Sequence, residues 1–306
     1  QVGQLLGAHP EELIFTSCGS ESDNAAWYSA TETQPEKRHV ITTKVEHSAV
    51  LAYAHYLEDK GYDVTWLGVD DKGQIDLEEL EKAIRPDTAL VSMMYANNET
   101  GTIFPIDKVA QIVKSHGVQL HVDAVQAFGK LPINVRKLGA DLVTVSSHKI
   151  HGPKGVGALY IKNGIKLKAV NVGGGQEKDI RPGTEPMPAI AGFMGAVNEL
   201  TVEKSLQKMT VLRSDFVEKL RSIDGVSINS PDDALPYIVN LSLKGLRSET
   251  VLNLLSDMDI YVSSGSACAK GHKSHVLTAM GLTNDEIRGT VRFSFDINIT
   301  RDDIDY

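Results

Sequence analysis

Short apolar runs alternate with helical patterns along the first two thirds of the chain. Residues 89–95 form a continuous apolar run, as in a strand that is buried on both faces. The apolar residues from Ile106 onward recur every three or four positions, as on one face of a helix. The predicted strands are residues 14–16, 39–44, 63–67, 89–95, 118–122, 142–146 and 158–161. Strands separated by helices indicate right-handed crossover connections and a mostly parallel sheet.

The pattern changes after about residue 190. Residues 194–223 have the pattern of one long charged helix, and they are followed by a strand (237–243), a helix (251–258) and another strand (291–294). No Gly/Ser-rich or Pro-rich linker separates the halves, so the long helix is the expected junction. We predict an α/β chain with a large domain over residues 1–205 and a small α+β domain over residues 206–306. Because the chain opens within a helical pattern and closes on an acidic run that resembles a helix start, we expect a fragment.

Composition and charge narrow the class of protein. Of the 306 residues, 42% are hydrophobic and 23% are charged, which is typical of a globular protein. Lys and Arg number 31 against 40 Asp and Glu, and the net charge of −9 argues against a nucleic-acid partner. No apolar run is long enough for a membrane span, and no signal peptide is visible. The two cysteines, Cys18 and Cys268, exclude a disulfide framework and a cysteine-only metal site, so we expect a reducing cytoplasm and no metal.

Polar residues follow several of the predicted strands, where an open parallel sheet binds its ligands. Gly19 and Ser20 lie at a strand-to-helix turn. The backbone N–H groups of this turn either bind an anion, or the small residues are there only because the turn is tight. Asp123 follows a buried strand and either caps the next helix or holds a cation, such as a metal or a protonated ring nitrogen.

Two further residues have the surroundings of reactive groups. Lys149 lies between a buried strand and a glycine turn, where a lysine has a lowered pKa and forms imines with aldehydes, whereas Lys154 has the pattern of an exposed turn residue. Cys268 lies in a small, polar and basic segment, where nearby cations favour the nucleophilic thiolate. Cys18 lies in a tighter turn with fewer basic neighbours. An aspartate, a lysine and an anion cradle after successive strands together fit pyridoxal 5′-phosphate (PLP).

At this point the chain resembles the class V aminotransferase-fold cysteine desulfurases of the NifS/IscS type. The resemblance covers the chain in eight blocks: FTSCGSESDN (15–24), VEHSAV (45–50), NNETG (97–101), HVDAVQAFGKLPI (121–133), SSHKIHGPKGVGALY (146–160), RPGTEP (181–186), SSGSAC (263–268) and VRFSF (291–295). It implies the fold type I of PLP-dependent transferases, with a mostly parallel central sheet.

The resemblance also implies a role for each matched residue. Lys149 would bind the cofactor covalently and move the substrate proton, and Cys268 would accept the sulfur of L-cysteine as a persulfide while alanine leaves. Arg292 would bind the substrate carboxylate, with Asn98 beside the ring. His47 would stack on the ring face and, as a catalytic residue, assist proton transfer. The other cofactor contacts would be Asp123 at the ring nitrogen, Gln126 at the phenolic oxygen, and Gly19, Ser20, Ser146, His148 and, from the partner of a homodimer, Thr184 at the phosphate.

Three departures from the family pattern carry expectations of their own. A family segment with an Asn-Ala-Thr stretch is absent before Gln1, and the C-terminal helix is cut short after Tyr306. Gly19-Ser20 replaces the common Ala-Thr but keeps the hydroxyl. The loop after Cys268 is about two residues shorter than in housekeeping enzymes, which favours a dedicated sulfur acceptor, such as a tRNA-thiolation protein, over the usual iron–sulfur scaffold.

Two alternative functions stay open at this stage. Another lyase of the same fold, such as a selenocysteine lyase or cysteine sulfinate desulfinase, would use Lys149 but depend less on Cys268. A truncated, non-catalytic relative would act only as a binding partner.

Overall fold

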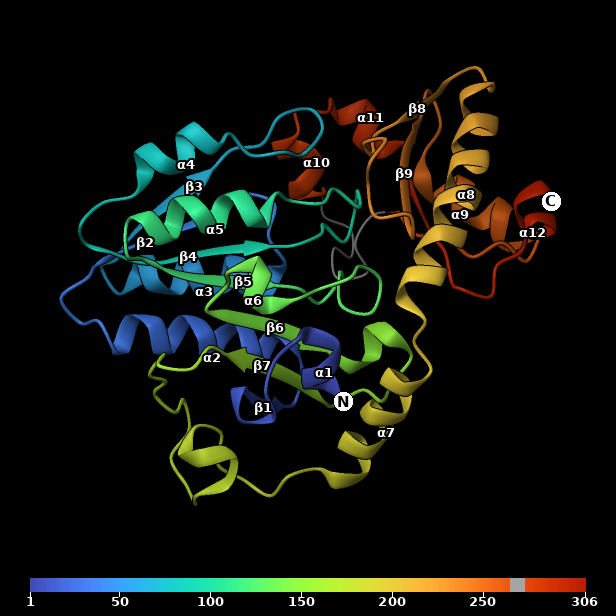
Figure 1. Cartoon of the computed structure of the whole chain (residues 1–306). Helices are drawn as coiled ribbons and strands as arrows, with labels where there is room; N and C mark the ends of the chain where they lie inside the picture. Colours follow the sequence, from blue (N-terminus) through green and yellow to red (C-terminus); the bar gives the residue numbers. More distant parts are fainter. Residues whose placement is uncertain (265–272) are drawn as a thin grey trace. The chain divides into compact units, whose positions relative to one another are not determined.

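The computed structural model describes residues 1–264 and 273–306, which contain a large sheet in the order β1-β7-β6-β5-β4-β2-β3 (Figure 1). The strands β2 to β6 pair in parallel, whereas β7 runs antiparallel to both β1 and β6. This is the mostly parallel sheet that the sequence predicts. The strands are β1 (Leu13–Thr16), β2 (His39–Thr43), β3 (Asp63–Leu67), β4 (Thr88–Met94), β5 (Gln119–Asp123), β6 (Leu142–Ser146) and β7 (Gly157–Ile161).

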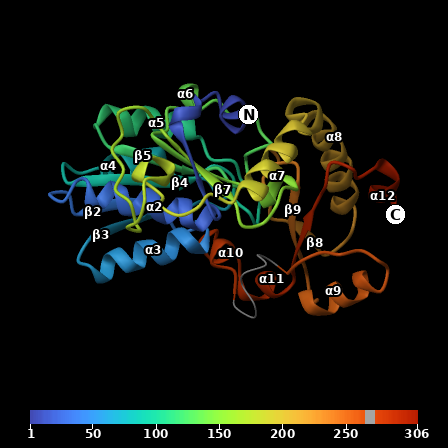
Figure 2. The same ribbon diagram turned by 90° about the horizontal axis from the view of Figure 1, so that it is seen from below.

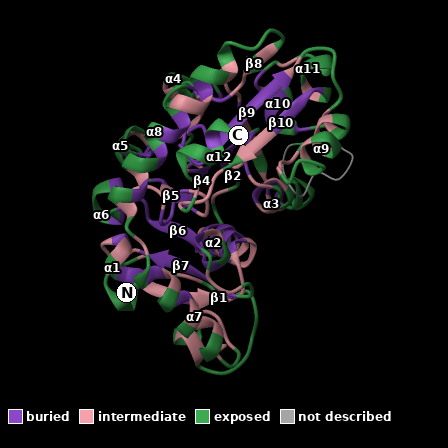
Figure 3. Ribbon diagram, turned by 90° about the vertical axis from the view of Figure 1, so that its right-hand side faces the viewer, coloured by how far each residue is buried: buried purple, intermediate pink, exposed green. Residues whose placement is uncertain are grey.

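Helices cover both faces of this sheet, as Figure 3 shows for α5 and α6 on one side and α2 and α3 on the other. Every residue of β4, β6 and β7 is buried, which explains why these strands are apolar without alternation. The covering helices are α2 (Gly19–Glu32), α3 (Ser48–Asp59), α4 (Leu77–Ala83), α5 (Ile106–Ser115) and α6 (Val135–Leu138). Shorter elements and the following helix are α1 (Val2–Leu6), η1 (Pro10–Glu12), η2 (Ser147–Ile150), η3 (Gln176–Asp179) and α7 (Met187–Asn198).

A second, antiparallel sheet in the order β10-β9-β8 forms from the C-terminal part of the chain. Its strands are β8 (Val226–Ile228), β9 (Ile238–Leu243) and β10 (Thr290–Ser294). The helices of this part, visible in Figure 2, are α8 (Val202–Arg221), α9 (Ser248–Ser256), α10 (His275–Ala279), α11 (Asn284–Arg288) and α12 (Arg301–Asp305).

The chain divides into two compact units, and two short segments, Gly68–Ile75 and Ala96–Phe104, belong to the second unit with Val202–Tyr306. Hydrogen bonds hold Ala96–Phe104 against this unit's own sheet. Ser230 Oγ donates to the Thr100 carbonyl at 2.6 Å, and Asn240 Nδ2 donates to the Glu99 carbonyl at 3.2 Å. Contiguous sequence ranges do not express this division.

The single long helix expected over residues 194–223 is wrong, because the structure contains two helices there. α7 ends at Asn198 and α8 begins at Val202. Thr201 precedes α8, and threonine is among the residues favoured at a helix start. The break also marks the boundary between the two units. Among the described residues, no helix combines the length and apolar character needed to cross a membrane.

Candidate active site

Asp123 is the last residue of β5 and is only 6% exposed. Its Oδ1 accepts the Val125 N–H at 2.9 Å. Burial raises the pKa of the Asp123 carboxyl, while the Val125 N–H and the charges of His47 and Lys149 act in the opposite direction. The structure therefore brings three of the predicted site residues, from three different elements, within electrostatic reach of one another.

Lys149 lies half-buried in η2, directly after β6. The turn that follows is tight, since His151 has a left-handed backbone (φ 65°) and a Cβ on Gly152 would collide with Ser147 Oγ. Lys149 and its neighbours also act on His148, whose pKa is lowered by burial first and by the Lys149 charge second. The tight turn thus holds the amine at the carboxyl end of β6, beside Asp123.

His47 is the residue that precedes α3, and its ring is held by the helix start. Its Nδ1 accepts the Ala49 N–H at 3.2 Å, so the proton of the neutral ring is on Nε2. This hydrogen bond fixes the ring plane from one side.

The predicted anion cradle lies at the N-terminus of α2. The first N–H groups of a helix have no intrahelical acceptor and carry the positive end of its dipole. A Cβ on Gly19 would lie 2.9 Å from Val125 Cγ2 and 3.8 Å from Ser146 Cβ, so this helix end lies close to the loops after β5 and β6. Ser146 Oγ and His148 Nδ1 are hydrogen-bonded at 2.8 Å. The predicted phosphate contacts of this unit therefore gather around the start of α2.

The other predicted cofactor contacts of this unit are Gln126 and Thr184. Gln126 Oε1 accepts from Lys130 Nζ at 3.3 Å. Thr184 is exposed, and no hydrogen bond in the described part of the chain joins its side chain to Ser20, Ser146 or His148. Its exposure is compatible with a contact made in a second subunit.

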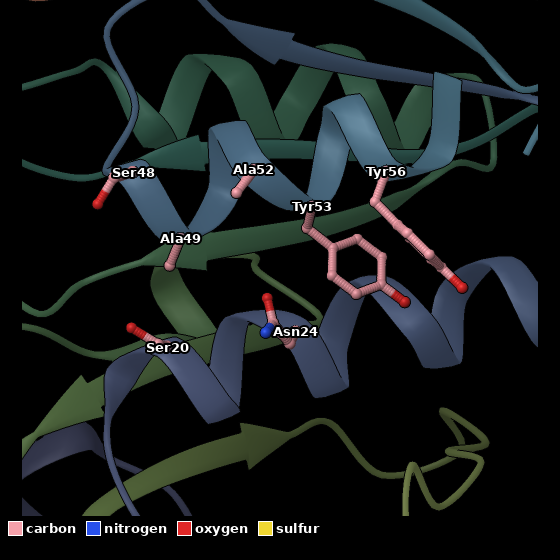
Figure 4. A pocket seen from close by; sticks show the side chains of 7 residues that line it. All are labelled: Ser20, Asn24, Ser48, Ala49, Ala52, Tyr53 and Tyr56. Atoms are coloured by element: carbon pink, nitrogen blue, oxygen red, sulfur yellow. The ribbon is translucent and has the colours of Figure 1, made fainter. Parts of the chain in front are cut away.

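A pocket of about 360 Å³ opens between the first turns of α2 and α3 (Figure 4). In Figure 4 the Tyr53 ring reaches from α3 toward α2, and on α2 the buried Asn24 Oδ1 has no hydrogen-bond partner in the described part of the chain. Burial raises the pKa of the Tyr53 hydroxyl. The pocket extends the cradle on the Ser20 side, and it is lined by Ser20, Asn24, Ser48, Ala49, Ala52, Tyr53 and Tyr56.

Asn98 and Arg292 belong to the second unit, where they contact each other. Arg292 Nη1 donates to the Asn98 carbonyl at 2.9 Å, and Arg292 Nε is buried without a hydrogen-bond partner among the described residues. Burial lowers the pKa of Arg292, and the Glu99 charge partly offsets this effect. A buried guanidinium with an unmatched donor is suited to bind a carboxylate.

Cys268 lies outside the described residues. The chain before it is anchored, because Ser263 and the Arg292 strand exchange two backbone hydrogen bonds, of 3.1 Å and 2.7 Å. The predicted sulfur acceptor therefore follows a segment that is paired with the strand carrying the predicted carboxylate ligand.

The residues present fit PLP. A half-buried lysine, a buried carboxyl that faces the charges of His47 and Lys149, and a helix N-terminus match the aldehyde, ring nitrogen and phosphate of this cofactor. Sequence reasoning missed three buried groups behind these residues, namely Asp23, Glu46 and His121. Asp23 could have been found from its spacing, since it lies one helical turn after Gly19 and so on the same face of α2.

The family model for aminotransferase class-V matches residues 1–306. The chain therefore belongs to the class V aminotransferase family, in agreement with the resemblance found in the sequence.

The relatives within this family include a cysteine desulfurase of Nostoc sp., which is 46% identical over 100% of this chain and 78% of its own length. The cysteine desulfurase IscS of Clostridium botulinum is 42% identical over 100% of this chain and 79% of its own length. A solved NifS-like protein superposes with a TM-score of 0.91 at 42% identity, covering 100% of this chain and 82% of that one. The structure of SspA in complex with cysteine gives a TM-score of 0.84 at 38% identity, over 96% and 84% of the two chains. The predicted PLP-dependent transferase fold is thus confirmed.

Proposed function

We propose that this chain is a PLP-dependent cysteine desulfurase that converts L-cysteine to L-alanine and receives the sulfur on Cys268. The observation that carries the proposal is the convergence of Asp123, Lys149 and His47 at the carboxyl ends of the strands. The relatives that are named cysteine desulfurases, at 41–46% identity over the whole chain, support the same activity.

PLP, when bound, supplies an electron sink for the charge that develops at the substrate α-carbon. The Asp123 carboxylate would keep the ring nitrogen protonated, because an anion at this buried position favours the cationic form of its partner. Lys149 would anchor the cofactor and take the substrate proton on Nζ. The N–H groups at the start of α2, with Ser20, Ser146 and His148, would hold the phosphate.

The resemblance assigns the contacts to the amino acid to Arg292 and Asn98. Arg292 has an unmatched Nε donor for the substrate carboxylate, and Asn98 lies beside it. Cys268 would attack the substrate sulfur as a thiolate, so that the carbon–sulfur bond breaks and a persulfide forms on Cys268.

We further propose that the protein acts as a cytoplasmic homodimer and passes its sulfur to an acceptor protein, either an iron–sulfur scaffold or a tRNA-thiolation enzyme. The exposed position of Thr184 supports the dimer, since its predicted phosphate contact needs a second copy. The short segment after Cys268 favours a dedicated acceptor.

The two cysteines of the chain offer a matched test of the activity. PLP-loaded protein is incubated with L-cysteine, and alanine and protein-bound persulfide are measured. We expect Cys268→Ala to lose both products by about 100-fold or more, and Cys18→Ala to stay within about threefold of wild type, because a nucleophile contributes orders of magnitude and a bystander does not. Equal rates for Cys268→Ala and wild type would refute the persulfide role, and absence of alanine from wild type would refute the function.

A further inference from the structure

One face of α2 carries buried polar residues onto the sheet. Asp23 and Trp27 lie one and two turns after Gly19, and both are buried, at 2% and 0% exposure. α2 packs on β4, β5 and β6. The sheet residues on this face include Ser92, His121 and Thr144, each with 0% exposure. A polar layer therefore lies between the helix and the strands, beneath the end of β5.

Hydrogen bonds link the side chains of this layer in a chain. The Trp27 indole N–H, which can only donate, contacts Ser92 Oγ at 2.9 Å, and Ser92 Oγ lies 2.7 Å from His121 Nδ1. If Ser92 donates to Nδ1, the proton of the neutral His121 ring is on Nε2. His121 Nε2 lies 3.0 Å from Thr144 Oγ1, and the Thr144 hydroxyl donates to the Asp23 carboxyl. The chain of donors thus ends at Asp23.

The charges around the two aspartates differ in sign. Burial first and the Asp123 charge second raise the pKa of the Asp23 carboxyl well above its ordinary value, while the Thr144 hydrogen bond acts in the opposite direction. His121, at 3.6 Å from Asp23 Oδ1, supplies no compensating charge, because burial lowers the pKa of its ring to about 3. Asp123 instead faces His47 and Lys149, which favour its ionised form, and it also accepts the Val125 N–H.

Two neighbouring buried carboxyls cannot both be ionised at low cost, because like charges in a low-dielectric interior repel strongly. Asp23 Oδ1 is buried without a hydrogen-bond partner among the described residues, which is costly for a carboxylate oxygen. Asp123 is the better stabilised anion of the two.

We propose that Asp23 is a positioning residue that carries a proton at neutral pH, so that the negative charge of the Asp23–Asp123 pair resides on Asp123. The inference rests on the proposed function only in that Asp123 would face the ring nitrogen of the cofactor. A neutral Asp23 would pack beneath Asp123 and would not compete with it for the protonated ring nitrogen.

Infrared spectroscopy of the PLP-loaded protein tests this directly, because a protonated carboxylic acid has a carbonyl band that a carboxylate lacks. We expect such a band at neutral pH in wild type, and we expect it to shift on labelling with ¹³C-aspartate. The part of the band that shifts with ¹³C-aspartate should disappear in Asp23→Asn. It should persist in the control Glu46→Gln, whose buried carboxyl is not an aspartate. Absence of an aspartate-labelled band from wild type, or its persistence in Asp23→Asn, would overturn the proposal.

The visible band of the bound cofactor gives an independent measurement. An amide imitates a neutral acid, so in Asp23→Asn the proton concentration at which this band titrates should change by less than about threefold, whereas removal of a real negative charge would shift it by about tenfold or more. Should Asp23→Asn fail to fold, Thr144→Val serves instead. Loss of the Thr144 donor should move the aspartate carbonyl band, and an unmoved band would contradict the assignment. None of these spectra requires turnover, so an inactive desulfurase would not be mistaken for an ionised Asp23.

Discussion

Lys149 and Lys154 are the same residue type five positions apart in one turn region, yet their surroundings differ. Lys149 is half-buried near Asp123, whereas Lys154 is exposed. Replacing Lys149 by Ala should lower alanine formation by about 10² to 10⁴-fold, the contribution typical of a positioned acid–base group, and should abolish the visible band of the lysine-bound cofactor.

Lys154→Ala is the matched control for this substitution. It removes the same charge and stem from the same turn, and it should keep the band and stay within about twofold of the wild-type rate. Loss of the band in both variants would show that the turn, rather than the Lys149 amine, is what matters.

Residues at strand ends were predictable, whereas the residues behind them were not. Asp123 and Lys149 directly follow apolar strands, and a charged residue at such a position is informative without any structure. Asp23 and His121 come from a helix and a strand far apart in the sequence, and only the packing of α2 on β5 shows that they meet. The direction of their hydrogen bonds depends on Trp27 and Ser92, which in the sequence have the pattern of an ordinary core residue and an ordinary strand residue.

At the scale of elements, the start of α2 should be sensitive to a single methyl group. Gly19→Ala would place a Cβ 2.9 Å from Val125 Cγ2, so the Val125 side chain, the helix end or the loop after Asp123 must shift. We expect PLP affinity to fall by about tenfold, which corresponds to about 1.4 kcal/mol, as measured by titration of the cofactor's absorbance.

Gly195→Ala on α7 is a suitable comparison, because the added Cβ would meet open space. This helix should become more stable by about 0.5–1 kcal/mol, and PLP affinity should not change. If both variants bind PLP with the affinity of wild type, the close approach at Gly19 does not contribute to PLP binding.

Most strands of the large sheet could be predicted from the sequence to within two residues, since burial on both faces makes them continuously apolar. β8 was missed because it has three residues, none of them fully buried. The break between α7 and α8 was missed because residues 194–223 contain neither Pro nor an internal turn motif, and the helical pattern resumes at Val202. The periodicity showed where helices are possible, whereas the tertiary packing decides where each one ends.

At the scale of the whole molecule, a buried acid should make stability depend on pH. Glu46 Oε1 accepts from Thr43 Oγ1 and from the Met94 N–H, and burial raises the pKa of the Glu46 carboxyl to about 8 from the ordinary 4.5. Between these values unfolding releases a proton, so the free energy of unfolding should fall as pH rises, by up to about 1.4 kcal/mol per pH unit from this group.

Urea unfolding at about pH 5.5 and about pH 7.5 measures this slope. Glu46→Gln should reduce the slope and leave only the part due to other groups, while Glu36→Gln at an exposed position should leave it unchanged. A slope that is identical in wild type and Glu46→Gln would mean that Glu46 is ionised in the folded protein.

The proposed dimer can be tested by subunit complementation. If Thr184 acts in the partner's site, a mixed dimer of a Lys149→Ala chain and a Thr184→Ala chain contains one site with both residues intact. Activity should rise when these two chains are co-expressed and purified through different tags, above that of either variant alone. A Lys149→Ala/Thr184→Ala chain paired with wild type has no intact site and should show no such rise. Higher activity in the mixture with wild type than in the mixture of the two single variants would place Thr184 in the site of its own chain.

The membership of Ala96–Phe104 in the second unit has a consequence for how the protein is made. The chain changes unit after Leu67, Ile75, Tyr95, Phe104 and Thr201, so the second unit includes pieces that are synthesised long before most of it. Ser230 and Asn240 donate to carbonyl groups on those early pieces. When only the first half of the chain has been synthesised, these carbonyl groups do not yet have their partners. The second unit therefore cannot be excised as one continuous segment. A cut at the Thr201–Val202 junction would separate the Ser230 and Asn240 donors from their acceptors, and it would leave Gly68–Ile75 and Ala96–Phe104 without the rest of their unit.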